Sequence, residues 1–165
     1  MPPRVREYAE ISFTPGRPML DAITDLTHRI FTEFTYKHGA TTVSSSITDV
    51  MEARAGVCQG FALVAVGCLR SMGLAARYVS GYLSTYAPAG KERMIGVDAS
   101  HAWAAVRLRD GSWFDFDPTN DTFADERYTT VAWGRDYDDV PPLRGVIFTD
   151  ADKNKMDVSV DVAPL

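Results

Sequence analysis

Apolar and polar positions alternate in two different ways along this chain. Apolar side chains recur at intervals of three and four residues over positions 19–34, which predicts an amphipathic helix. In the loop that follows, Ser46 or Thr48 is placed to cap a short helix through Arg54. Residues 8–13 instead alternate with a period of two, which predicts an edge strand near the N-terminus.

The segment after Gly56 is apolar nearly all round. From Val57 it runs C-Q-G-F-A-L-V-A-V-G-C-L-R-S-M and stops at Gly73, a residue that ends helices well because it adopts positive φ without strain. A helix without a polar face has to be covered on most sides. We therefore expect this helix to lie at the centre of the core.

Strand patterns dominate the second half of the chain. The predicted strands are 76–83, 101–108 and 113–117, followed by a last hairpin from 144–148 and 157–162. Helices first and antiparallel strands afterwards is the order of an α+β protein, not of one built from βαβ units. The predicted fold class is α+β, with a central helix packed on an antiparallel sheet.

Composition and charge narrow the possible partners. The 165 residues suit a single domain over 1–165. The net charge of −5 and the absence of a Lys/Arg stripe argue against nucleic acid as a partner. No apolar run reaches the length of about 20 residues that a membrane span needs, and the N-terminus lacks a signal-like apolar core. We expect a cytoplasmic protein; the oligomeric state cannot be predicted.

The two cysteines differ in their expected environments. Cys58 and Cys68 are ten residues apart on the same predicted helix, roughly 15 Å along its axis and too far for a disulfide. Unpaired thiols are typical of a reducing compartment. The free N–H groups at a helix N-terminus favour a thiolate. Cys58 begins the helix and Cys68 lies well inside it, so Cys58 is the candidate nucleophile.

One of the three histidines is placed to act as a base. His28 falls off the apolar stripe of its helix and is expected on the surface, and His38 lies in a loop. His101 opens a predicted strand and shares a face with Trp103. Trp103 is a candidate wall of a substrate pocket, and simple core packing is an equally good interpretation.

The turn between the predicted strands 101–108 and 113–117 determines which acidic side chain lies beside His101. A three-residue loop at 109–111, with its glycine in the left-handed conformation, is a common hairpin connection. It pairs Trp103 with Asp117, so Asp117 lies diagonally beside His101 on the same face. Asp115 shares that face but lies too far along the strand. A loop of two or four residues would move Asp117 to the other face.

Several sequence blocks resemble the core of the bacterial transglutaminase-like superfamily. They are G-V-C-Q-G-F-A-L (56–63), the following 70–83, S-H-A-W-A-A-V-R-L (100–108) and G-S-W-F-D-F-D-P-T-N (111–120). The resemblance implies a papain-like core in which Cys58 is the nucleophile, His101 the base and Asp117 the acid that orients it. Segment 133–145 also resembles a tail of bacterial members, many of which have been described as cysteine proteases.

The resemblance implies a peptidase or amidase that forms a thioester with a peptide or protein amide. Two alternatives stay open: a protein-glutamine γ-glutamyltransferase that cross-links or deamidates, and a domain that binds or scaffolds without turnover. No cofactor is implied, and no Cys/His spacing indicates a metal. Gln59 and Trp103 are the candidate substrate-binding residues.

Two departures from the family pattern concern the substrate range and the domain content. Gly60 and Leu63 stand where bacterial relatives often carry an acid and a histidine. Both positions lie in the first turns of the central helix, where they can shape a pocket. Relatives also often carry a β-rich N-terminal half, for which 165 residues leave no room.

Overall fold

The computed structural model describes residues 2–42, 44–84, 99–142, 145, 148 and 160–162. The helices in this part of the chain are α1 (Pro3–Ser12), α2 (Met19–Glu33), α3 (Ile47–Ala53), α4 (Cys58–Ser71) and the 3₁₀ helix η1 (Tyr137–Asp139). The strands are β1 (Thr35–Tyr36), β2 (Ala55–Gly56), β3 (Ala76–Leu83), β4 (Ala99–Arg107), β5 (Trp113–Asp117), β6 (Thr122–Phe123) and β7 (Tyr128–Gly134). None of the described helices is long and apolar enough to cross a membrane.

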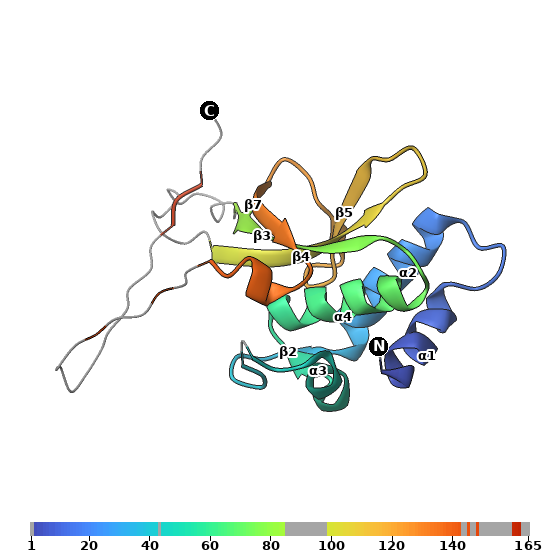
Figure 1. Ribbon diagram of the computed structural model, residues 1–165, viewed down its shortest axis with the longest axis horizontal. Coiled ribbons are helices and arrows are strands. Elements are labelled where there is room, and N and C mark those ends of the chain that lie inside the picture. The colour runs from blue at the N-terminus through green and yellow to red at the C-terminus, as the bar shows by residue number, and fades with distance from the viewer. Residues whose placement is uncertain are drawn as a thin grey trace, which may run out of the picture.

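The central helix lies between two layers (Figure 1). On one side α4 contacts β3 and β4 of an antiparallel sheet with the strand order β6-β5-β4-β3-β7, and on the other side it contacts α1, α2 and α3. A short parallel pair, β1 with β2, leads directly into α4. The predicted α+β class and the central position of this helix are confirmed.

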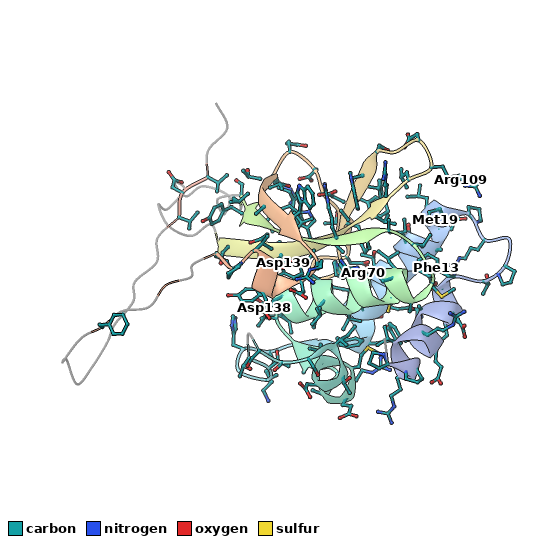
Figure 2. The ribbon with its side chains drawn as sticks, viewed as in Figure 1. Phe13, Met19, Arg70, Arg109, Asp138 and Asp139 are labelled. Carbon is teal, nitrogen blue, oxygen red and sulfur yellow. The ribbon has the colours of Figure 1, made fainter. Side chains whose placement is uncertain are left out.

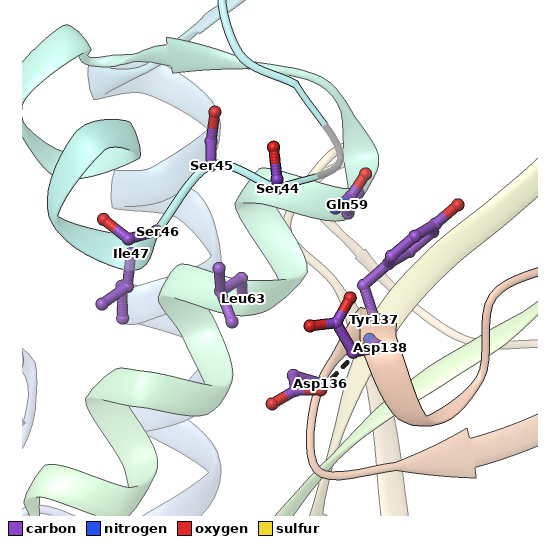
Figure 3. Close-up of a pocket in the computed structure, with 9 residues that line it drawn as sticks. All are labelled: Ser44, Ser45, Ser46, Ile47, Gln59, Leu63, Asp136, Tyr137 and Asp138. Carbon is purple, nitrogen blue, oxygen red and sulfur yellow. Dashed lines mark hydrogen bonds between the residues drawn. The ribbon is translucent and has the colours of Figure 1, made fainter.

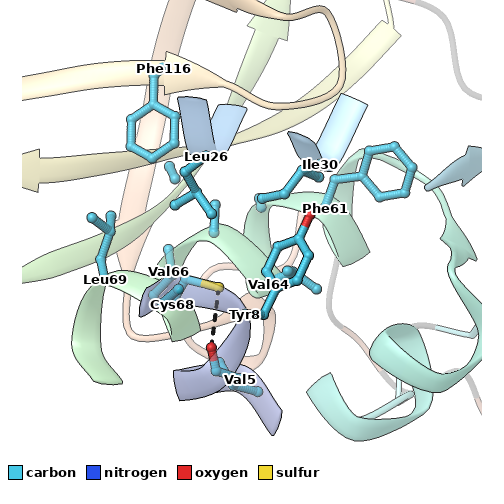
Figure 4. Packing of buried hydrophobic residues seen from close by; sticks show 14 of the residues in the cluster. Val5, Tyr8, Leu26, Ile30, Phe61, Val64, Val66, Cys68, Leu69 and Phe116 are labelled. Atoms are coloured by element: carbon cyan, nitrogen blue, oxygen red, sulfur yellow. Dashed lines mark hydrogen bonds between the residues drawn. The ribbon is translucent and has the colours of Figure 1, made fainter. Parts of the chain in front are cut away.

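The core surrounds α4 because that helix has no continuous polar face. Figure 4 shows the packing of side chains from α1, α2, α4 and β5. Each of these is at most 4% exposed: Val5, Tyr8, Leu26, Ile30, Phe61, Val64, Val66, Cys68, Leu69 and Phe116. Burying this much apolar surface, at about 25 cal/mol per Å², fixes the start of α4 relative to the sheet.

The prediction of an N-terminal edge strand over 8–13 was wrong. Proline occupies the first turn of α1, where its missing N–H costs nothing. Val5, Tyr8, Ala9 and Ser12 then follow at helical spacing and are buried against the rest of the molecule. A six-residue alternation overlaps this pattern, and the burial of one helical face decided the outcome.

Most other local predictions are confirmed. Segments 76–83 and 113–117 are strands β3 and β5 with the expected bounds, and 101–108 corresponds to β4. Ser46, and not Thr48, caps α3: its Oγ accepts from the Asp49 N–H at 3.3 Å, and the Asp49 carboxylate accepts from the Ser46 N–H at 2.7 Å.

The predicted and observed strands differ toward the C-terminus. Strand β7 was not predicted at all, although it forms an edge of the sheet beside β3. The predicted hairpin of 144–148 and 157–162 lies almost entirely outside the described residues.

Candidate active site

Cys58 occupies the first position of α4. The residue before it, Val57, has an extended backbone, and the β1–β2 pair holds the chain just upstream. Cys58 is half-buried whereas Cys68 is fully buried, and neither forms a disulfide. Burial raises the pKa of the Cys68 thiol to about 12. Only Cys58 therefore combines access to solvent with a helix N-terminus.

The hairpin between β4 and β5 has the predicted register. Arg107 pairs with Trp113, and Ala104 pairs with Phe116. The turn closes with Leu108 N–H donating to the Ser112 carbonyl at 2.9 Å. Its glycine has φ of 89°, in the region that a side chain would strain. A three-residue loop thus sets Asp117 on the face of His101.

His101 and Asp117 form a close buried pair. His101 Nε2 lies 2.6 Å from Asp117 Oδ2, and the two side chains are 9% and 0% exposed. Because Nε2 contacts the carboxylate, Nδ1 is the nitrogen left for the Cys58 thiol. His101 and Cys58 also line the same cleft, and their side chains are close enough to form a hydrogen bond.

Further donors surround the Asp117 carboxylate. Asn120 Nδ2 and the Tyr128 hydroxyl donate to Oδ2 at 2.6 and 2.8 Å, and the Thr119 N–H donates to Oδ1 at 2.8 Å. Asn120 Nδ2 also lies 3.4 Å from His101 Nε2. A buried carboxylate with this many donors is held in its ionised form and in one orientation.

His101 and Asp117 shift each other's pKa toward the charged form of each side chain. Burial alone would lower the pKa of His101, but hydrogen bonds and charge from Asp117 and Cys58 outweigh it and raise the pKa to about 9. Burial would likewise raise the pKa of Asp117, and the His101 imidazolium, Asn120 and Tyr128 together hold it below its usual value. These shifts favour a protonated His101 beside an ionised Asp117 at neutral pH.

A cleft opens beside the cysteine. Its volume is about 190 Å³, and its walls include Cys58, Gln59, His101, Tyr78 and Tyr137. Burial first, and then the charge of Cys58, raises the pKa of the Tyr78 hydroxyl. A carbonyl group bound in this cleft would thus meet the thiol, the imidazole and a phenol.

The two predicted substrate-binding residues lie in different places. Gln59 lines the cleft. Trp103 is fully buried and is not one of the described residues that line the cleft. It packs on Tyr128, with ring centroids 5.2 Å apart, and its Nε1–H donates to Asp115 at 2.9 Å. Of the two interpretations of Trp103, the structure favours core packing, because the tryptophan fills the sheet face behind His101.

The two residues that depart from the family pattern, Gly60 and Leu63, lie in different surroundings. Gly60 is buried, and a Cβ there would lie 3.3 Å from Val50, so the glycine serves the contact between α3 and α4. Leu63 lines a neighbouring cavity and shapes the surface next to the nucleophile.

Sequence reasoning missed Asn120 and Tyr128. Asn120 stands three residues after Asp117, in the same tight turn, and that spacing is a signal that could have found it. Tyr128 reaches the site from β7, eleven residues from Asp117 and across the sheet, so no local pattern indicates it. The remaining histidines lie elsewhere: His28 is on the surface and pairs with Asp121 at 2.7 Å, and His38 is exposed.

Metal ligands are not gathered in the described part of the chain. No group of three or more His, Cys, Asp or Glu side chains there is arranged to hold a metal ion.

A cysteine at the start of a central helix, facing a histidine–aspartate pair on an antiparallel sheet, defines a papain-like fold. The chain belongs to the transglutaminase-like superfamily, whose family model matches residues 7–118, more than half of its length. The family named by the sequence resemblance is thereby confirmed.

The relatives are bacterial proteins that are longer than this chain. An uncharacterized protein of Mycobacterium tuberculosis is 55% identical over 164 residues, covering 97% of this chain and 52% of the relative. An uncharacterized protein of Mycobacterium leprae is 41% identical over 133 residues, covering 79% and 45%. The chain thus spans about half the length of the curated relatives it matches.

Solved structures show the same fold. A protein from Cytophaga hutchinsonii, described as a "putative cysteine protease", superposes with a TM-score of 0.70 at 25% identity, over 84% of this chain and 44% of that one. The periplasmic domain of TgpA from Pseudomonas aeruginosa gives a TM-score of 0.55 at 24% identity, over 72% and 43%. The second likeness concerns the fold alone.

Proposed function

We propose that this protein is a cysteine hydrolase, a peptidase or amidase, that uses Cys58, His101 and Asp117 as a catalytic triad. One observation carries the proposal: His101 contacts Asp117 through Nε2 at 2.6 Å while it shares a cleft with Cys58 at the start of α4. A nucleophile, a base and a group that orients the base are the three parts of this chemistry. Members of the superfamily act on protein or peptide substrates, which supports an amide as the target.

In the proposed resting state the Cys58 proton already lies on His101, so that a thiolate faces an imidazolium. The thiolate sulfur attacks the carbonyl carbon of the amide and forms a C–S bond, and the carbonyl electron pair moves onto oxygen. When the tetrahedral intermediate collapses, the C–N bond breaks and the His101 imidazolium gives its proton to the leaving nitrogen. The products of this half-reaction are a free amine or ammonia and a thioester on Cys58.

Water completes the cycle. His101 removes a proton from a water molecule, whose oxygen attacks the thioester carbon. The C–S bond then breaks, the carboxylic acid leaves, and the proton on His101 again faces the Cys58 thiolate. Throughout, Asp117 stays ionised and holds the imidazole in one orientation.

Two donors are available to the developing oxyanion. The N–H of Cys58 lies at the helix N-terminus, where backbone N–H groups are free. Tyr78 lines the same cleft as Cys58, which makes its hydroxyl a candidate for the second donor. A preorganised donor of this type contributes on the order of 3 kcal/mol to the transition state.

Acyl transfer to an amine is the second candidate function. It shares the thioester and differs only in the group that resolves it, and the broader superfamily includes both outcomes. Hydrolysis leads because water reaches an open cleft without a dedicated amine site. A non-catalytic scaffold is the third candidate, and a readout of thiol reactivity separates it from the first two.

The first experiment measures the alkylation rate of Cys58 by iodoacetamide against pH, with mass spectrometry identifying the modified residue. In the wild type the rate should plateau well below the free-thiol pKa of about 8.5, because the thiolate is paired with an imidazolium. His101→Ala should lose the plateau and follow a free thiol.

Cys68 serves as an internal control for the folded state, since it is fully buried. Slow alkylation of Cys58 with a free-thiol midpoint in both proteins would overturn the proposed triad and favour the scaffold.

A further inference from the structure

Three cavities lie next to one another across the candidate active site. The central one contains Cys58 and has a volume of about 190 Å³. A second, of about 270 Å³, lies between the segment before α3 and η1. A third, of about 370 Å³, lies between β3, β7 and the segment after η1.

Shared walls join the three cavities into one groove. Gln59 and Tyr137 line both the central cavity and the one toward α3. Ser80, Ser100 and Pro142 line both the central cavity and the one toward β7. The nucleophile thus lies in the middle of a groove with an arm on each side.

The arm toward α3, called here the polar arm, is lined mainly by oxygen-bearing side chains. Figure 3 shows Ser44, Ser45 and Ser46 along one rim, Asp136, Tyr137 and Asp138 along the other, and Gln59 and Leu63 on α4 between them. The two rims face each other across the start of α4, so a side chain of a bound substrate can enter between them.

The polar arm contains a carboxylate, that of Asp138, without an ion-pair partner among the described residues. Arg135 pairs with Asp139 at 2.9 Å, and Arg70 lies close enough to Asp136 and Asp139 for their charges to interact. Figure 2 shows Arg70, Asp138 and Asp139 in this part of the molecule. Asp138 is exposed, and no cationic side chain of the described residues pairs with it. An ammonium or guanidinium group of a substrate can supply that partner.

The arm toward β7, called here the apolar arm, has a different character. Apolar and aromatic side chains form most of its lining, namely Tyr82, Val131, Ala132, Val140, Pro141 and Pro142. Ser80, Ser100 and Asp139 also line it, and the Asp139 carboxylate is paired with Arg135. Val131 is 63% exposed, which is high for an apolar side chain on a strand. Covering it with an apolar substrate side chain removes that surface from water.

We infer that the groove binds an extended polypeptide segment with its target amide at Cys58, a basic side chain in the polar arm and an apolar side chain in the apolar arm. A small amide fills only the central cavity, whereas an extended chain, at about 3.3 Å per residue, reaches both arms. This inference rests on the proposed function and specifies its substrate class.

The test uses a library of peptides of about ten residues, roughly 33 Å when extended, blocked at both ends and randomised around a central glutamine. Mass spectrometry detects both backbone cleavage and loss of side-chain ammonia. Wild-type protein should prefer a basic residue on one side of the target and an apolar residue on the other. Truncating either side should lower kcat/KM by at least about tenfold, since remote binding energy contributes to the transition state.

Matched variants connect the preference to each arm. Asp138→Asn should reduce the preference for a basic residue by about three- to fivefold, and Asp21→Asn, which removes an exposed carboxylate on α2, should leave it unchanged. Val131→Lys should abolish the apolar preference, and Ile11→Lys, at a comparably exposed site (59%) on α1, should not. Equal turnover of short and long peptides, or the same result for variant and control, would overturn the groove while leaving the triad intact.

Binding to Cys58→Ala separates the groove from the chemistry. If the wild type turns over nothing, enrichment of the same basic and apolar pattern on immobilised Cys58→Ala, lost when Asp138→Asn is added, would uphold the groove and reject hydrolysis. Absence of enrichment on Cys58→Ala would overturn the groove itself.

Discussion

The carboxylate of Asp117 has the most constrained environment of the candidate active site. It is fully buried, and donors from His101, Thr119, Asn120 and Tyr128 surround it. Burying a charge without partners is costly, and each charge-assisted hydrogen bond offsets part of that cost. The same bonds fix the direction in which the carboxylate holds the imidazole.

Tyr128→Phe removes one of these donors and keeps the ring. The phenyl group can preserve the contacts with Trp103 and His101, whose ring centroids lie 5.2 and 6.1 Å from that of Tyr128. Losing a hydrogen bond to the ionised form should raise the pKa of Asp117 and lower stability by about 1–3 kcal/mol. Chemical denaturation against pH measures both effects.

The Tyr82→Phe variant is the control, because Tyr82 does not contact Asp117 among the described residues. An unchanged acid limb of stability in Tyr128→Phe would show that the tyrosine hydroxyl does not help to hold the carboxylate.

The raised pKa of His101 predicts a pH dependence of stability. Its folded-state pKa is about 9 and its ordinary value is 6.5, so its contribution is fully present below about pH 6.5 and is lost as pH rises toward 9. That shift corresponds to a contribution on the order of 3 kcal/mol. The difference in unfolding free energy between wild type and His101→Asn should therefore shrink between these two pH values.

Asp117 acts in the opposite pH range. Its pKa is lowered, so its contribution is present above the ordinary carboxyl value of about 3.9 and is lost as pH falls below it. If the difference in unfolding free energy between wild type and His101→Asn stays constant from pH 6.5 to 9, the result would contradict the ion pair between His101 and Asp117.

At the scale of elements, local sequence signals place the groove and the site. The capping box of Ser46 and Asp49 starts α3 next to the polar arm. The turn with Gly111 sets the register that brings Asp117 to His101. Each signal extends over only a few residues: the capping box fixes where α3 begins, and the turn fixes which residues of β4 and β5 are paired.

Ser46→Ala should destabilise the protein by about 1 kcal/mol, because the Asp49 N–H loses its partner at the helix start. Thr48→Ala is the matched control: it changes a similar side chain within α3 that does not cap the helix. Thermal unfolding of both variants tests this. Equal melting temperatures would mean that the capping box contributes nothing measurable.

At the scale of the whole molecule, the two thiols report on different events. Cys68 is fully buried, its Sγ lies 3.8 Å from the Val5 carbonyl, and burial raises its pKa to about 12. Cys58 lies at the surface end of the same helix. In native conditions iodoacetamide should therefore modify Cys58 alone.

Cys68 should react only when the core around α4 opens. Its alkylation rate should follow the global unfolding equilibrium and rise with denaturant. Mass spectrometry over a urea series, with Cys58→Ala as the background, measures it. Rapid labelling of Cys68 without denaturant would show that the core opens locally, against the packing described here.

The central helix and the contact between His101 and Asp117 could be predicted from the sequence by itself. The all-apolar segment after Gly56 identified the central helix, and the three-residue turn identified Asp117 as the partner of His101. These predictions succeeded because helical periodicity, strand alternation and turn geometry act over short stretches of chain. The catalytic roles and the cytoplasmic location stay predictions.

The tertiary structure alone decided the rest. Burial of one face against α4 made residues 8–12 helical, where a six-residue alternation had predicted a strand. Strand β7, which carries Tyr128 to Asp117, joins the sheet beside β3 through long-range pairing that no local pattern records. The groove, too, exists only where the segment before α3, η1 and β7 meet around α4. Local patterns determine which element forms, whereas distant burial determines what each element faces.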